Sequence, residues 1–120
     1  MLADDRVRLQ HMVDAGDAIA GFMAGRTQED LGRDQMLLFA VTRAVEIIGE
    51  AAARLTEATR AQAPHLPWTA IVSMRNRLIH GYFDVDPDIV WRTVSDEIPA
   101  LLPHLRDLLA SADPVTDVRA

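Results

Sequence analysis

The 120-residue chain contains no cysteine and no lysine, and aromatic residues make up only 5% of it. The absence of cysteine excludes disulfide frameworks, thiolate zinc sites and cysteine nucleophiles. With so few aromatics, the core must be built mainly from Ala, Leu, Ile, Val and Met, a composition that favours helices. The first ten residues carry two acids instead of a basic leader, and no apolar run approaches bilayer-spanning length. We therefore expect a cytoplasmic protein that makes no membrane contact.

The charge is acidic overall but unevenly distributed. Twelve arginines stand against eighteen acidic residues, giving a net charge of -6. Using arginine alone is typical of GC-rich coding, although its planar fork also suits phosphate. An acidic chain is not expected to bind nucleic acid non-specifically, because such binding needs clustered positive charge to contact the phosphates. Only the segment 66–82 is clearly positive, at +2, so a local anion site remains open there.

Apolar spacing predicts two long helices in the first half of the chain. One covers residues 5–23, and the second begins near Asp34. The second has the strongest periodicity, with steps of three and four that suit antiparallel packing; its seam consists of Leu38, Val41, Val45, Ile48, Ala52 and Leu55. The polar stretch 25–32 has a glycine at each end and is predicted to be a connection.

The second half of the chain is divided by proline and glycine. Two prolines near residue 65 end the second helix, and a third helix is predicted over 68–80, with Gly81 as its C-terminal cap. Asp86 and Pro87 predict the start of a fourth helix, which Pro99 and Pro103 should kink or split near residues 95–99. Residues 111–120 are expected to fray.

These patterns predict an all-α fold, an antiparallel bundle of four to five helices formed by a single domain over residues 1–120. No strand-like alternation bounded by turn residues is present. Such a bundle can leave one apolar face uncovered, so we also expect a homodimer.

The string Met74–Tyr82 concentrates the chemistry of the chain. Cleavage of RNA without a metal needs a base for the 2′-hydroxyl proton and a fixed cation for the charge that grows on phosphorus. His80 can be that base or acid, since its ordinary pKa is ~6.5, and Arg75 can hold the phosphate, with Arg77 as a neighbouring cation that contacts RNA. On a continuous helix Arg75 and His80 would point about 140° apart. Either the helix ends and releases His80, or two subunits share the site.

A purely structural explanation of this string is also open, because arginines and a histidine at a helix C-terminus complement the helix dipole. Glu46 has two possible roles. It can form an ion-pair ladder with Arg43 and Glu50 on its own helix, or it can orient Arg75 or His80 across the bundle. The other three histidines have no metal-ligand spacing, and we expect neither a metal site nor a cofactor.

Four blocks of the sequence resemble those of a known family. Residues 75–82 resemble the motif of arginine, four residues, histidine, any residue and tyrosine found in HepT-like toxins, which belong to the HEPN superfamily of metal-independent ribonucleases. The blocks 43–51 and 86–91, together with Trp68 and Met74, are similar to the family pattern in the same order. The resemblance covers essentially residues 5–110.

The resemblance implies a specific activity and specific roles. Arg75 and His80 would be the catalytic pair at a homodimer interface, with Asn76 supporting them. A minimal nucleotidyltransferase antitoxin would transfer AMP to Tyr82 and so silence the ribonuclease. Added negative charge and bulk two residues from the base would repel RNA phosphates. The expected function is therefore an endoribonuclease toxin of a toxin–antitoxin pair.

Two other functions remain open from the sequence. The chain could be a non-catalytic helical subunit that binds a nucleotidyltransferase through the same patch. It could also be a plain structural dimer whose basic patch is only a helix terminus.

Overall fold

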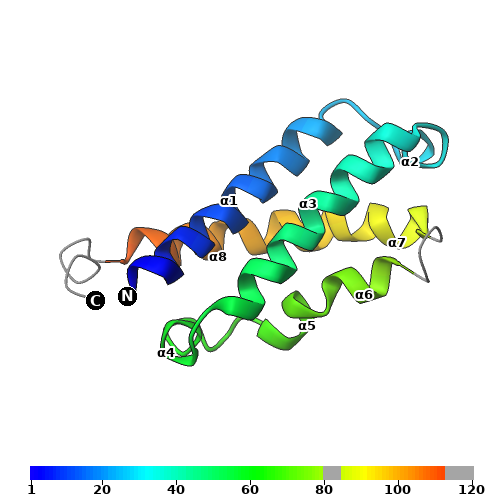
Figure 1. Cartoon of the computed structure of the whole chain (residues 1–120). Coiled ribbons are helices and arrows are strands. Elements are labelled where there is room, and N and C mark those ends of the chain that lie inside the picture. The colour runs from blue at the N-terminus through cyan, green and yellow to red at the C-terminus, as the bar shows by residue number, and fades with distance from the viewer. Residues whose placement is uncertain (80–84, 113–120) are drawn as a thin grey trace.

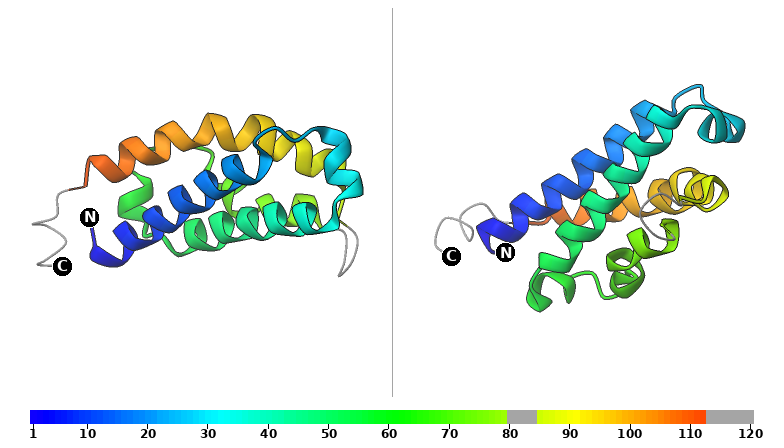
Figure 2. Two further views of the ribbon diagram at one scale, coloured as in Figure 1. Left: turned by 90° about the horizontal axis from the view of Figure 1, so that it is seen from above. Right: turned by 45° about the vertical axis from the view of Figure 1, so that its right-hand side comes forward.

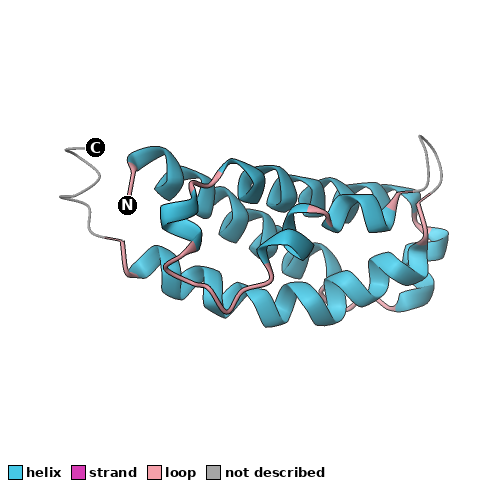
Figure 3. Cartoon of the chain, turned by 90° about the horizontal axis from the view of Figure 1, so that it is seen from below, coloured by secondary structure: helices cyan, strands magenta, loops and turns pink. Residues whose placement is uncertain are grey.

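The computed structural model describes residues 1–79 and 85–112, and its described elements are helical apart from one isolated bridge (Figures 1 and 3). The helices, in chain order, are α1 (Ala3–Met23), α2 (Gln28–Arg33), α3 (Gln35–Arg54), α4 (Glu57–Arg60), α5 (Trp68–Val72), α6 (Met74–Leu78), α7 (Pro87–Arg92), the π-helical segment η1 (Thr93–Glu97) and α8 (Ile98–Ala110). The all-α prediction is confirmed.

Four successive runs of the chain alternate in direction and pack as a bundle. They are α1, α3, the α5–α6 pair and the α7–η1–α8 run (Figure 1). The helix α1 contacts α3 along one side and α8 along another, as the turned views also show (Figure 2). The helix α3 also packs against α5 and α6. This arrangement matches the predicted antiparallel bundle.

The core is aliphatic, as the composition predicts. Its large side chains with almost no exposed surface come from all four runs and from α2; they are Leu9, Met12, Ile19, Leu31, Ile48, Ile71, Leu78, Ile98, Leu105, Val41, Val45 and Val90. None of the described helices is long and apolar enough to cross a membrane.

Capping residues set two of the helix starts. The Asp34 carboxylate accepts the Leu37 N–H at 3.1 Å and begins α3, as predicted. Asp86 accepts the N–H groups of Asp88 and Ile89 and begins α7 at Pro87, also as predicted.

Three expectations about the elements need correction. The stretch 25–32 is not only a connection, because a Thr27–Asp30 capping box starts α2 inside it. The third helix is two short helices, α5 and α6, and it ends at Leu78 instead of residue 80. The second helix, α3, ends at Arg54 instead of at the two prolines near residue 65, because the chain turns at Leu55 and Thr56 caps the short helix α4. The predicted disruption of the fourth helix is present as the π-helical segment η1, just before Pro99. Most of the expected frayed tail, residues 113–120, lies outside the described residues.

Candidate active site

The short helix α6 carries the candidate catalytic arginine, and two buried side chains fix it to the core. Met74 and Leu78 are 3% and 0% exposed, so the opposite side of α6 carries the polar residues of the motif. A turn at Ser73 separates α6 from α5, and its hydroxyl donates to the Thr69 carbonyl at 2.9 Å. The end of α5 packs closely on α3 at Gly49. A Cβ atom added to this glycine would lie only 3.2 Å from the Val72 carbonyl oxygen.

The chain leaves the helix before it reaches His80. Ile79 is extended, with φ -117° and ψ 121°, and it forms an antiparallel bridge with Val85. The Asp86 N–H donates to the Leu78 carbonyl at 3.1 Å, so the two sides of the segment 80–84 are tied together. The angle of about 140° expected for a continuous helix therefore does not apply, because α6 ends at Leu78. His80 and Tyr82 themselves lie outside the described residues.

Glu46 of α3 lies between two arginines. One oxygen of its carboxylate, Oε2, is 3.9 Å from Arg75 Nε and 3.2 Å from Arg43 Nη1. Arg43 also contacts Glu50 Oε1 at 3.2 Å. Both contacts considered for Glu46 are thus present: a ladder along α3 and a link across to α6.

The exposure of these side chains differs in a way that suits a binding site. The side chain of Glu46 is 20% exposed, whereas those of Arg75 and Arg43 are 53% and 59% exposed. Hydrogen bonds to Glu46 and then to Glu50 raise the pKa of the Arg43 guanidinium above its ordinary value. A largely covered carboxylate therefore holds two guanidinium groups that remain open to an incoming anion.

Arg77 does not join this cluster. Its Nη1 atom donates to Glu97 Oε1 at 2.9 Å, so the side chain is directed toward η1, on the side of α6 away from Glu46. Asn76 is exposed between the two arginines. The structure therefore brings Arg75 and Glu46 together and separates Arg77 from both. Glu97 was missed by sequence reasoning, because nothing local signals a contact twenty residues away.

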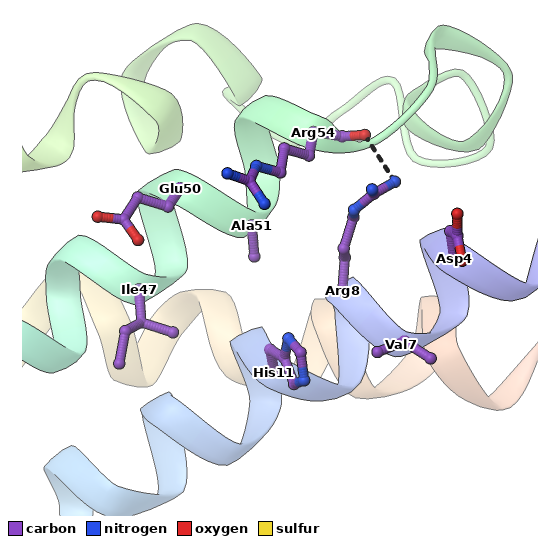
Figure 4. A pocket seen from close by; sticks show the side chains of 8 residues that line it. All are labelled: Asp4, Val7, Arg8, His11, Ile47, Glu50, Ala51 and Arg54. Atoms are coloured by element: carbon purple, nitrogen blue, oxygen red, sulfur yellow. Dashed lines mark hydrogen bonds between the residues drawn. The ribbon is translucent and has the colours of Figure 1, made fainter.

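Two hollows flank the site region on different sides of the bundle. One, of about 340 Å³, lies between α1 and α3 and shares Glu50 with the arginine cluster (Figure 4). At its far end Arg8 Nη1 donates to the Arg54 carbonyl at 3.2 Å. The second, of about 300 Å³, lies between α5–α6 and η1–α8 and contains the Arg77–Glu97 pair.

The histidines outside the motif, His11, His65 and His104, are exposed. The rings of His65 and His104 meet edge to face, with centroids 5.2 Å apart, at the end of the second hollow. Across residues 1–79 and 85–112, no group of three or more metal-ligating side chains is close enough to hold an ion.

Comparisons with known proteins agree with the sequence resemblance. The family model described as ribonuclease HepT-like matches residues 12–108. A Thermococcus cleftensis protein named "Probable ribonuclease HepT" is 39% identical over 93 residues, which cover 78% of this chain and 84% of that protein. No solved structure matches the chain significantly.

Two further relatives have names of the same kind. A Caldanaerobacter subterraneus protein named "Putative RNase" is 36% identical over 104 residues, covering 87% of this chain and 93% of its own. A Methanocaldococcus jannaschii protein with the same type of name is 34% identical over 106 residues, covering 88% of each chain. The match of the family model over most of the chain, together with these relatives, establishes that the chain belongs to the ribonuclease HepT-like family.

Proposed function

We propose that this protein is a metal-independent endoribonuclease toxin that acts in the cytoplasm as a homodimer and is controlled by a nucleotidyltransferase antitoxin. One observation carries the proposal. In a member of a ribonuclease family, Arg75 is an exposed cation held by Glu46 and lies five residues before a histidine. These are the two groups that metal-free RNA cleavage needs.

In the proposed reaction the RNA supplies its own nucleophile. His80 takes the proton of the 2′-hydroxyl, whose oxygen attacks the adjacent phosphorus, and the bond from phosphorus to the 5′-oxygen breaks. The leaving oxygen receives a proton from a second acid, either the histidine of the other subunit or water. Arg75 binds the non-bridging oxygens, where negative charge grows in the transition state.

Supporting roles follow for the neighbouring polar residues. Glu46 orients Arg75 through the 3.9 Å contact, and Arg43 holds Glu46 in turn. Asn76, exposed beside Arg75, supports the catalytic pair by hydrogen bonding to RNA or to His80. Arg77 contacts RNA further along the strand, and to do so it must exchange its Glu97 partner for a phosphate.

A cleavage assay in EDTA tests the catalytic assignments. Arg75→Ala and His80→Ala should each lower kcat/KM about 100-fold or more, because each removes a group that acts mainly in the transition state. Arg106→Ala is the matched control, since the side chain of Arg106 on α8 is 51% exposed against 53% for Arg75. His104→Ala is the control for the histidine. Full activity in either site variant would reject the assigned role.

The same assay separates an orienting role of Glu46 from a structural one. Glu46→Gln should raise KM several-fold because Arg75 loses its charged partner, while the unfolding midpoint stays near wild type. Glu57→Gln, a change of an exposed glutamate on α4, should leave both unchanged. If Glu46→Gln had the same KM as wild type, Glu46 would not orient Arg75, and only its structural ion pair with Arg43 along α3 would remain.

Regulation through Tyr82 is the second part of the proposal. The antitoxin would join the phosphorus of AMP to the phenolic oxygen of Tyr82 and release pyrophosphate from ATP, adding charge next to the cleavage site. Tyr82 is the only tyrosine of the chain, so Tyr82→Phe removes every phenol. Intact-mass measurement after co-expression with the transferase should show AMP added to wild type and none to Tyr82→Phe. Addition at any other residue would contradict the assignment.

The alternative is a non-catalytic subunit that binds a nucleotidyltransferase. The exposed side chains of Arg43 and Arg75, with Glu46 between them, could bind a protein equally well. This alternative predicts a stable complex that survives His80→Ala, together with no RNA turnover by the isolated protein. The cleavage assay therefore distinguishes the two functions.

A further inference from the structure

The hollow of about 300 Å³ between α5–α6 and η1–α8, here called the α6–α8 hollow, has the character of a ligand site. Among the side chains that line it, Ile71, Met74 and Leu101 are buried and apolar, whereas Ala70 and Ala100 are exposed at its rim. Because alanine carries only a methyl group, the two helical runs leave space between them here. A mostly apolar pocket with a few polar groups is typical of a small-ligand site.

Polar groups lie at the two ends of the α6–α8 hollow. The Arg77–Glu97 ion pair is at one end, and the rings of His65 and His104 are at the other. Glu97 and His104 are seven residues apart on the η1–α8 run, which places the two ends about 10 Å apart along the helix. Proteins bind unpaired RNA bases in this way, with apolar or aromatic side chains on the base and hydrogen bonds to its edges.

The free carboxylate oxygen of Glu97 identifies the base. Arg77 Nη1 donates to Oε1 at 2.9 Å, and no described residue donates to Oε2. A carboxylate only accepts hydrogen bonds, and guanine is the RNA base whose Watson–Crick edge carries two adjacent N–H donors, at N1 and N2. We propose that the α6–α8 hollow binds a guanine base of the RNA substrate and that the Glu97 carboxylate accepts its N1 and N2 hydrogens.

The phosphate next to this base has a place on the other side of the ion pair. Arg77 and Glu97 also line a hollow of about 580 Å³ between α6, α7 and η1. Arg92 lines it too, and the Arg92 side chain pairs with no group in residues 1–79 and 85–112. A phosphate between Arg77 and Arg92 would draw Arg77 away from Glu97, and the guanine donors would take its place on the carboxylate. Each charge of the opened pair therefore keeps a partner.

The position of Glu97 in the fold agrees with a binding role. Glu97 is the last residue of η1, and π-turns occur frequently at functional sites. Arg75 and Arg77 are two residues apart on α6, so one RNA strand can contact both. This inference rests on the proposed ribonuclease function and names a base that the RNA must contain near the cleaved bond.

Binding to inactive His80→Ala protein tests the choice of base. A labelled oligoadenylate with one guanine should bind about tenfold more tightly than the same strand without it, and inosine, which lacks the N2 amino group, should restore only part of the gain. Glu97→Gln should abolish or reverse this preference, because glutamine offers one acceptor and one donor, as the adenine edge requires. Asp96→Asn removes a charge from the same segment and should keep the preference. A guanine preference that survives Glu97→Gln, or none in the parent protein, would overturn the proposal.

Filling the α6–α8 hollow tests its location without changing any charge. Ala100→Leu should remove the guanine preference, whereas Ala110→Leu, at another exposed alanine of α8, should not. A preference that persists in folded Ala100→Leu would reject the hollow as the binding site. Displacement of the RNA by a tenfold excess of GMP would reject RNA as the occupant and assign the hollow to a free nucleotide.

Cleavage by the protein with its natural His80 separates this inference from the proposed function. RNA cleavage without a guanine preference in binding would reject the guanine site and leave the ribonuclease proposal intact. A guanine preference that Glu97→Gln removes, found in a protein that cleaves no RNA, would support the site and reject the ribonuclease proposal.

Discussion

Asp5 has no exposed side-chain surface although it is ionisable and lies in the first turn of α1. Its carboxylate accepts hydrogen bonds from the hydroxyls of Thr56 and Thr59, each at 2.6 Å, and from the Thr56 N–H at 3.2 Å. Burial acts to raise the pKa of Asp5, but these hydrogen bonds and the nearby Arg8 outweigh it and lower the pKa below its ordinary value. The residue ties the start of α1 to the start of α4.

This shift makes Asp5 a source of acid sensitivity. The pKa of Asp5 is lower in the folded chain than in the unfolded chain, so the unfolded state binds the proton more readily. The ionised carboxylate therefore stabilises the fold above about pH 4. This stabilisation is lost as the pH falls through the pKa of Asp5 in the folded chain. Asp5→Asn should lower the unfolding free energy at pH 7 by about 2 kcal/mol. In urea titrations the difference from wild type should narrow from pH 5 to pH 3.

The exposed neighbour supplies the control for this prediction. Asp4→Asn should change the unfolding free energy little at any pH, because Asp4 is exposed. A difference between wild type and Asp5→Asn that stays constant down to pH 3 would show that the ionised carboxylate contributes no extra stability.

The contacts of Glu46 could be predicted from the sequence, whereas those of Asp5 could not. Glu46 could be connected with Arg43 by helical spacing, and its possible reach to Arg75 followed from the bundle topology. The Asp5 network could not be found this way, because its hydroxyl donors lie 51 and 54 residues along the chain. An acid in a first helical turn is explained by the helix dipole alone, so nothing in the pattern pointed to burial.

At the scale of elements, the long helices were predictable and the short ones were not. The apolar stripe of α3 and the Asp86–Pro87 start of α7 are strong local signals. The helix α2 has only one buried residue, Leu31, so it carries no periodicity. The break between α5 and α6 falls at Ser73, where no glycine or proline announces it.

The break before His80 matters most for the site. A glycine at position 81 suggested a helix running to residue 80, but the bridge from Ile79 to Val85 ends α6 earlier. Pairing between segments on the two sides of a short connection outcompeted helix propagation, a tertiary effect that local propensity does not include. The structure therefore shows where Arg75 and Arg77 lie, whereas the roles of Arg75, His80 and Tyr82 stay predictions.

For the whole molecule, the net charge of -6 sets an electrostatic condition on RNA binding. Binding must depend on a few local arginines, because the remaining surface repels phosphate. We expect a shallow dependence of log K on log salt for single-stranded RNA, with a slope of about -0.7 for each phosphate contact. Arg75→Ala should make the slope less steep by about 0.7 to 1.4, since a dimer has two copies of the residue.

Titration of inactive His80→Ala protein with labelled RNA at several salt concentrations measures this slope without cleavage. Arg106→Ala in the same background should leave the slope unchanged, because its side chain pairs with Asp17 away from α6. If Arg75→Ala kept the full slope, phosphate binding would have to be assigned to other arginines of the dimer.

The π-helical segment η1 also bears on how the family can vary in length. A π-turn contains one more residue than an α-turn, so it is equivalent to a single-residue insertion within an otherwise continuous helix. Removing one residue from Thr93–Glu97 would let α7 run into α8 as an ordinary helix, with Leu101 and Leu105 still facing the core. A relative that is one residue shorter at this point could therefore inherit the same core without compensating substitutions, whereas a gap of equal size within α3 would rotate the buried side chains that follow it by about 100° away from the core.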